Sequence, residues 1–238
     1  KKLILNFKSK DSKKIQNPKN FLGGKGANLS EMGKMGLPVP PGFTISTKVC
    51  EIFYKDKKRL NHNLINQIKK ELKIIEKEVG KKFGDLKNPL LLSVRSGARV
   101  SMPGMMDTIL NLGLNDNTVN ALALKTSNGR FAKDSYRRFI QMYGNVVMGV
   151  ESYHFEELIE NYKLTKGVLL DTDLDESDWD GLIEDFKRTV KDKAKKDFPQ
   201  NVYEQLLGAI SAVFLSWESN RAKVYRKLNQ IPAEWGTA

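Results

Sequence analysis

The sequence has few of the residues on which several common kinds of site depend. It has one cysteine, Cys50, so no disulfide can form within the chain. Its two histidines, His62 and His154, lie far apart and have no cysteine beside them, so we expect no zinc site. No apolar run approaches the roughly 18 residues of a membrane-spanning helix. The single cysteine fits a reducing compartment, and we expect a cytoplasmic protein with no membrane partner.

The composition is strongly basic, with a formal net charge of +12 over 238 residues. A positive balance attracts polyanions, including nucleic acid and nucleotide phosphates. Most of the excess is lysine scattered along the chain, without a basic segment interleaved with aromatic residues. We therefore interpret most of this charge as solvated surface and predict no nucleic-acid partner. A basic, non-catalytic polyanion-binding module is the alternative that this charge would suit.

The front of the chain alternates short strands with helices. Residues 62–79 carry apolar side chains at spacings of three and four, which predicts an amphipathic helix. The apolar run 90–94 is typical of a buried strand. The other elements expected here are a strand at 1–7, a glycine loop at 21–27 leading to a helix that Gly36 ends, a strand at 43–45, and a helix capped by Ser46 or Thr47.

From residue 115 onward the pattern is almost entirely helical. We expect helices at about 117–125 with Asp116 as its cap, 131–148, 153–163, 178–195 and 200–228. The fold class is therefore α/β (α+β). We expect an α/β part at 1–114 plus 200–238, with a mostly helical subdomain at 115–199 inserted into it. The last residues, 231–238, do not resemble a polar tail, and we expect a further element to follow them.

The first candidate for ligand binding is the glycine-rich stretch from Gly23 to Gly26. Glycines allow backbone N–H groups to approach a phosphate closely, and Lys25 could supply a positive charge. The P-loop pattern fails, because Gly26 stands where Ser or Thr is required, and Leu29 breaks the dinucleotide fingerprint. Taken alone, this stretch fits a phosphate contact and a plain turn equally well.

The second candidate begins with Arg95, which follows the apolar run directly, and includes Arg99 four residues later. Ligands collect beyond the carboxyl ends of strands, and two guanidinium groups there could hold phosphate oxygens. The Gly/Ser/Met-rich segment that follows is typical of a surface that moves or wraps a ligand. Ordinary surface ion pairs are the alternative, but their place at a strand end favours a functional role.

The acidic residues between Asp171 and Asp180 invite a calcium-loop interpretation, which fails. Glu176 stands at the position that needs glycine, and Leu182 at the position that needs glutamate. Acidic side chains instead stabilise the N-terminus of the helix expected near residue 178.

Considered together, these segments resemble the opening of the pyruvate, phosphate dikinase and phosphoenolpyruvate synthase group. The segments that carry the resemblance are 21–32 (FLGGKGANLSEM), 36–45 (GLPVPPGFTI), 93–113 (SVRSGARVSMPGMMDTILNLG), 134–144 (DSYRRFIQMYG), 212–217 (AVFLSW) with Arg221, and 231–238 (IPAEWGTA). The stretch from Met102 to Asp107 is the dikinase version of its motif. A synthase-like or glucan dikinase-like phosphotransferase is therefore the second choice.

The resemblance implies an ATP-grasp nucleotide-binding domain. Lys25, Arg95 and Arg99 match family positions that contact the phosphates of ATP. The loop around Gly104, Met105, Asp107 and Thr108 is expected close to those phosphates.

The resemblance also implies a reaction for the intact protein. ATP, phosphate and pyruvate are interconverted with AMP, diphosphate and phosphoenolpyruvate through a phosphohistidine on a separate domain. No catalytic residue and no ligand to Mg²⁺ is expected within these 238 residues. The remaining ATP-grasp part, the phosphohistidine domain and the pyruvate-binding barrel would follow residue 238. The intact enzyme is expected to be a homo-oligomer, and this chain alone to be inactive and at best a weak binder of ATP.

Overall fold

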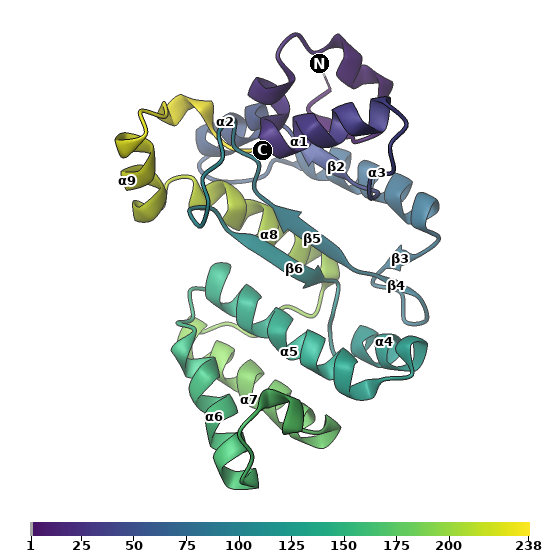
Figure 1. Cartoon of the computed structure of the whole chain (residues 1–238), viewed down its shortest axis with the longest axis vertical. Helices are drawn as coiled ribbons and strands as arrows, with labels where there is room; N and C mark the ends of the chain where they lie inside the picture. Colours follow the sequence, from purple (N-terminus) through teal and green to yellow (C-terminus); the bar gives the residue numbers. More distant parts are fainter. Residues whose placement is uncertain (1) are drawn as a thin grey trace. The chain divides into compact units, whose positions relative to one another are not determined.

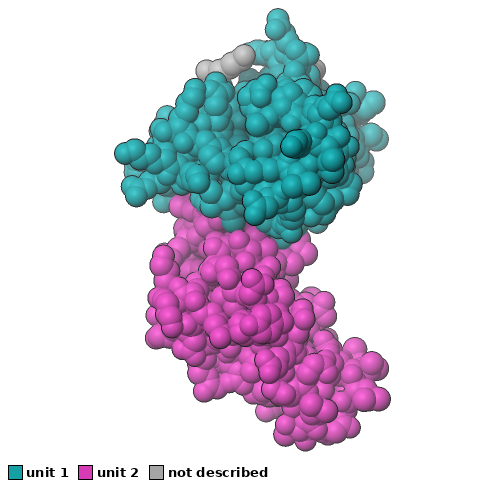
Figure 2. Space-filling model, turned by 90° about the vertical axis from the view of Figure 1, so that its left-hand side faces the viewer, with its two compact units in different colours: residues 1–80, 95–108, 210–238 teal, residues 81–94, 109–209 magenta. Residues whose placement is uncertain are grey.

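The computed structural model describes residues 2–238, a mixed, mostly helical chain with small sheets that divides into two compact units (Figures 1 and 2). Unit 1 comprises the residues up to 80 together with 95–108 and 210–238, and unit 2 comprises 81–94 and 109–209. Unit 2 contains residues 115–199, which we expected as an inserted helical subdomain, together with residues 81–94, 109–114 and 200–209.

Unit 1 combines a small antiparallel sheet with helices. Strands β1 and β2 pair with Ile4 opposite Ile45, and helices α1, α2 and α3 contact this sheet or one another. Buried Phe53 and Ile68 contribute to the core. The elements are β1 (Ile4–Asn6), η1 (Lys10–Lys14), α1 (Pro18–Lys34), β2 (Phe43–Ile45), α2 (Thr47–Lys55), α3 (His62–Val79), α9 (Asn220–Leu228) and η3 (Ala233–Trp235).

Unit 2 packs helices around buried aromatic rings. Helix α5 contacts α4 and α7, and α7 also contacts α6. Phe139 and Phe198 meet edge to face at 5.6 Å between ring centroids, a favoured aromatic geometry. The elements are β3 (Lys82–Phe83), β4 (Pro89–Leu90), α4 (Thr118–Thr126), α5 (Gly129–Val146), α6 (Tyr153–Lys166), η2 (Asp171–Asp173) and α7 (Glu176–Ala194).

Three further elements continue along the chain from one unit into the other: β5 (Leu92–Arg95), β6 (Thr108–Leu112) and α8 (Val202–Ser216). Strands β3 and β4 are parallel, and β5 pairs with β6. None of the helices in the described part of the chain combines the length and apolarity that crossing a bilayer requires.

The most strongly patterned predictions are confirmed. Helix α3 spans the predicted 62–79, with Asn61 capping its start and Gly80 ending it in the left-handed region. Gly36 likewise follows α1 at φ 76°. The acidic run serves a helix start as expected, because the Asp175 carboxylate accepts hydrogen bonds from the N–H groups of Ser177 and Asp178 at the start of α7.

Other expectations are wrong in detail. Helix α1 begins at Pro18, before the glycines, because proline suits the first turn of a helix. The run 90–94 is not one buried strand, since it divides between β4 and β5 and Ser93 is exposed. The expected helix 200–228 is two helices, because Ser219 ends the run and caps α9.

The expected helix caps also need correction. Ser46 occupies the N-cap position of α2, but its hydroxyl makes no hydrogen bond among residues 2–238. Asp116 does not cap α4. The Asn115 side chain accepts a hydrogen bond from Thr118 N–H at 2.8 Å, and the Asp116 carboxylate is engaged by Tyr136 and by a lysine of α7.

Candidate phosphate-binding site

The glycine-rich stretch forms a bend inside α1. Gly23 has φ 67° and ψ 171°, which is non-helical, and the helix resumes with Gly24 and Lys25. A β-carbon placed on Gly23 would lie 1.7 Å from the carbonyl oxygen of Gly97, far inside van der Waals contact. Glycine is therefore required at position 23 both for its backbone angles and for this close approach.

This bend lies directly against the segment that carries the two arginines. Gly24 N–H donates to the carbonyl oxygen of Ala98 at 2.9 Å. Gly97 in turn exchanges two backbone hydrogen bonds with Ala238, at 2.9 and 3.1 Å. Figure 1 shows the C-terminus beside α1 and α2, so three stretches that are distant in the sequence meet here. All three stretches belong to unit 1. Because Lys25 follows Gly24 directly, the hydrogen bond from Gly24 to Ala98 places the Lys25 backbone beside the segment of Arg95 and Arg99.

The three cationic side chains differ in their surroundings. Lys25 and Arg95 are exposed, whereas Arg99 is half-buried. The Arg99 guanidinium lies 5.0 Å from the centre of the Trp235 ring, a cation–π distance. Its Nε is buried and has no hydrogen-bond partner within the described residues. Nor does any carboxylate of residues 2–238 form an ion pair with Lys25, Arg95 or Arg99. The three side chains therefore carry positive charge without an ion-pair partner in the described part of the chain.

Contacts with other parts of unit 1 hold the loop from 102 to 107 at both ends. Met102 is buried and packs with Trp217 and Ala222. At the other end the Asp107 carboxylate forms an ion pair with Arg221 on α9. Between them Gly104 has φ 71° and open space on the side where a β-carbon would lie.

The remaining loop residues complete this turn. Met105 N–H donates to the carbonyl oxygen of Met102 at 3.1 Å, and Met105 is partly buried against the cluster of Met102 and Trp217. Thr108 begins β6. The two ends of the loop are anchored, and its tip is open.

Two contacts at this site could not have been assigned from the sequence. Trp235 belonged to a noticeable motif at the end of the chain, but nothing in that motif indicated that its ring covers Arg99. Arg221 was part of the family resemblance, yet its partner Asp107 lies in a different motif. The one available signal was that the acidic Asp107 and the basic Arg221 both belong to segments that carry the family resemblance.

Cys50 is buried beneath Gly236 and Thr237, near the end of the chain, and is not one of the candidate phosphate contacts. Burial raises the pKa of its thiol to about 11, although a hydrogen bond involving the backbone of Thr237 opposes this shift. The thiol is therefore protonated at neutral pH, which supports a packing role.

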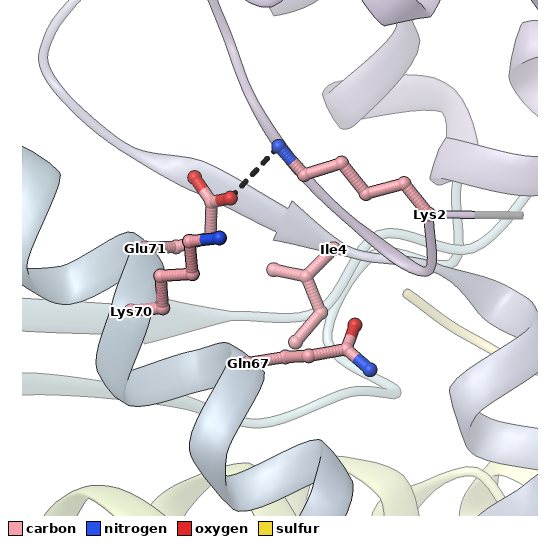
Figure 3. A pocket seen from close by; sticks show the side chains of 5 residues that line it. All are labelled: Lys2, Ile4, Gln67, Lys70 and Glu71. Atoms are coloured by element: carbon pink, nitrogen blue, oxygen red, sulfur yellow. Dashed lines mark ion pairs between the residues drawn. The ribbon is translucent and has the colours of Figure 1, made fainter.

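A hollow of about 260 Å³ lies elsewhere in unit 1, between the chain around β1 and the helix α3 (Figure 3). Its lining residues are Lys2, Ile4, Gln67, Lys70 and Glu71. Lys2 forms an ion pair with the Glu71 carboxylate at 2.9 Å across it. None of the predicted phosphate-binding residues lines this hollow. We base the candidate site on the meeting of the glycine bend and the arginine segment instead.

Comparison with known proteins identifies the family. The family model described as "Pyruvate phosphate dikinase, AMP/ATP-binding domain" matches residues 19–70 and 57–238. The chain belongs to this family. The first matched range includes the glycine bend, and the second includes the arginine segment and the loop to Thr108.

Individual relatives agree with the family model. The chain is 54% identical to pyruvate, phosphate dikinase of Clostridium symbiosum over 92% of its own length and 25% of that protein. It is 51% identical to the chloroplastic enzyme of Mesembryanthemum crystallinum over 100% of this chain and 25% of the relative. The Rickettsia conorii protein is 48% identical over 100% of this chain and 27% of its own length. The chain therefore spans about a quarter of the curated relatives that it matches.

Proposed function

We propose that this chain binds ATP as the nucleotide-binding part of a pyruvate, phosphate dikinase. The observation that carries the proposal is the hydrogen bond from Gly24 N–H to the carbonyl oxygen of Ala98, which joins the glycine bend to the arginine segment. Family membership supports the same reading, because the match includes both segments. The division of the chain into two units is compatible with an ATP-grasp domain that carries an inserted helical part, and we propose that assignment too.

Lys25, Arg95 and Arg99 are the proposed contacts to the phosphates of ATP. Guanidinium groups can bind phosphate oxygens through two parallel hydrogen bonds, and the lysine ammonium adds a compact charge. Since no described carboxylate pairs with them, a phosphate would not have to displace an internal partner. The Trp235 ring, 5.0 Å from the Arg99 guanidinium, would limit the orientations of this side chain and so lower the entropy lost on binding.

The loop containing Gly104, Met105, Asp107 and Thr108 is proposed to lie over these phosphates. Its open glycine tip allows a ligand to approach the backbone closely, while the buried Met102 fixes its base. In this proposal the loop excludes water from the phosphates rather than supplying a reacting group.

For the whole protein we propose the reaction of the named relatives, in which ATP, phosphate and pyruvate are interconverted with AMP, diphosphate and phosphoenolpyruvate. Mg²⁺ would neutralise charge that develops on the phosphates. Within residues 2–238 no group of three or more His, Cys, Asp or Glu residues could hold a metal ion. These residues do not fit a complete magnesium site, and we assign none of them to the metal.

The test is equilibrium binding of ATP by calorimetry, with the protein expressed from its complete coding sequence. Replacing Arg95 by Leu should weaken binding about tenfold or more, since a hydrogen bond to a charged group contributes about 1.5–3 kcal/mol. Arg188→Leu is the matched control, because Arg188 is an exposed arginine of α7 with its own carboxylate partner, Asp185. We expect that variant to bind as wild type does.

Two results would count against the proposal. One is the absence of ATP binding by the wild-type protein. The other is equal affinity of the Arg95 and Arg188 variants. A steep salt dependence of binding to generic DNA, with no binding of ATP, would instead favour a polyanion-binding module. In assays of the half-reactions, Arg95→Leu should abolish phosphorylation by ATP and spare exchange with phosphoenolpyruvate, whereas equal loss of both would indicate misfolding.

A further inference from the structure

The loop from Met102 to Asp107 is fastened by contacts of two different kinds. At its base the Met102 side chain is buried against Trp217 and Ala222, and the Ser216 hydroxyl lies 3.8 Å from the sulfur of Met106. These apolar and weakly polar contacts hold the loop at Met102 and at Met106. Neither contact involves a charged group. The ion pair at Asp107, the last residue of the loop, therefore needs a separate explanation.

The ion pair joins Asp107 to Arg221, near the start of α9. The Asp107 side chain is 23% exposed and the Arg221 side chain 50% exposed. A partly exposed pair of this kind contributes only about 0–1 kcal/mol to stability, because water and salt screen it. The ion pair therefore contributes less to the free energy of unfolding than the buried Met102 contact does. A role in placing the loop explains the pair better than a role in holding the domain together.

Electrostatics also limits what Asp107 can do beside a triphosphate. A bare carboxylate near phosphate oxygens repels them, whereas a carboxylate paired with a guanidinium carries no net charge with its partner. Arg221 thus neutralises Asp107 as well as fixing its position. An ionised carboxylate offers only hydrogen-bond acceptors, as phosphate oxygens do, so Asp107 has no favourable direct contact to make with the phosphates.

We infer that Asp107 and Arg221 are positioning residues whose ion pair holds the 102–107 loop over the phosphates of ATP, and that Asp107 does not itself bind the nucleotide. The inference rests on the proposed function, since it concerns the same site. The open tip at Gly104 is the part of the loop left free to meet the ligand, because both flanks are tied down.

The experiment measures ATP affinity by calorimetry together with KM for ATP and kcat, again in the protein expressed from its complete coding sequence. Asp107→Asn and Arg221→Gln should each weaken ATP binding about three- to fivefold, the most that a pair contributing about 1 kcal/mol can supply, and raise KM more than they lower kcat. The double variant should be no weaker than either single variant, because both changes remove one interaction. The exchanged pair, Asp107→Arg with Arg221→Asp, should recover most of the affinity.

A purely structural pair would behave differently. Thermal unfolding of the single variants should shift by less than about 4 °C, as expected of a weak surface pair. Glu51→Gln serves as the control, because Glu51 forms exposed ion pairs with Lys48 and Lys55 in the same unit. We expect that variant to leave ATP binding unchanged.

The outcomes separate this inference from the function on which it rests. If wild-type protein does not bind ATP, the proposed function fails. If wild type binds ATP and Asp107→Asn binds equally well, the positioning role alone is wrong. Additive losses in the double variant would show that the two residues act independently, which also contradicts the inference. If the exchanged pair does not fold, the comparison of single and double variants still decides the question.

Discussion

The α-carbon of Gly23 faces the carbonyl group of Gly97 so closely that an added methyl group would lie 1.7 Å from the oxygen. This contact and the adjacent hydrogen bond from Gly24 to Ala98 bring the glycine bend and the arginine segment together. The site that we propose therefore depends on one tight backbone approach.

The first prediction tests that approach with two glycine-to-alanine changes. Gly36→Ala should cost about 1 kcal/mol in the free energy of unfolding, because its φ of 76° disfavours a β-carbon but the surrounding space is open. Gly23→Ala has a similar φ and also meets the Gly97 backbone, so it should cost at least about 3 kcal/mol and weaken ATP binding. Urea unfolding of both variants makes the comparison. Equal losses would mean that the close approach is unimportant.

The second prediction concerns a buried glutamine in unit 2. The Gln205 amide is fully buried and accepts a hydrogen bond from Gly113 N–H while donating to the carbonyl groups of Leu114 and Pro199, all at 2.8–3.0 Å. Gln205→Leu leaves these buried backbone groups without partners. It should lower the free energy of unfolding by about 3 kcal/mol or more.

The control for that change is Gln67→Leu on α3, where the amide makes a long hydrogen bond of 3.4 Å near the surface. We expect it to change stability by no more than about 0.5 kcal/mol. Chemical denaturation followed by circular dichroism measures both. A Gln205→Leu variant as stable as the control would show that water satisfies the exposed backbone groups instead.

The sequence predicted well where a local signal was complete. The helix 62–79 has a cap at Asn61, a glycine at position 80 and a continuous apolar face, so its bounds follow from neighbouring residues alone. The break between α8 and α9 was missed because the apolar spacing runs on through Trp217 and masks the local cap, in which the Ser219 side chain accepts a hydrogen bond from Ala222 N–H.

The candidate site could be predicted only in parts. The sequence marked the glycine stretch and the segment of Arg95 and Arg99 separately, and neither motif contains information about the other. Their contact depends on Gly23 meeting Gly97 across a large sequence separation, which local propensity does not encode. The pairing of β5 with β6 is likewise non-local, and it explains why the apolar run before Arg95 divides into two strands.

The third prediction uses Trp235 as a reporter of nucleotide binding. Its ring stacks with the Arg99 guanidinium, and a phosphate that engages this arginine should change the emission of the ring. ATP should therefore alter the intrinsic fluorescence of wild-type protein. Trp235→Phe should remove most of this change while calorimetry still detects binding.

Trp179 provides the matched control, because its ring stacks with the Arg137 guanidinium at 4.5 Å. Both residues belong to unit 2, whereas the proposed phosphate contacts belong to unit 1. Trp179→Phe should keep the fluorescence response to ATP. A response that survives in the Trp235 variant and disappears in the Trp179 variant would contradict the assignment of Arg99 to the phosphates.

The last prediction concerns the reactivity of Cys50, the one cysteine of the chain. Burial raises the pKa of this thiol from 9.0 to about 11, so at pH 8 the folded protein holds about 100-fold less thiolate than the unfolded chain. Alkylation by iodoacetamide should accordingly be at least about 100-fold slower in native protein than in urea. The native rate should rise about tenfold for each pH unit and level off only near pH 11.

The same shift fixes the sign of the stability change. Because the folded pKa is raised, the protonated thiol stabilises the folded state fully below about pH 9, and this contribution is lost as pH rises towards 11. Cys50→Ala removes the titrating group, so its stability relative to wild type should improve over that interval. Native alkylation at pH 8 as fast as in urea would show that the segment with Gly236 and Thr237, which packs on the thiol, opens readily.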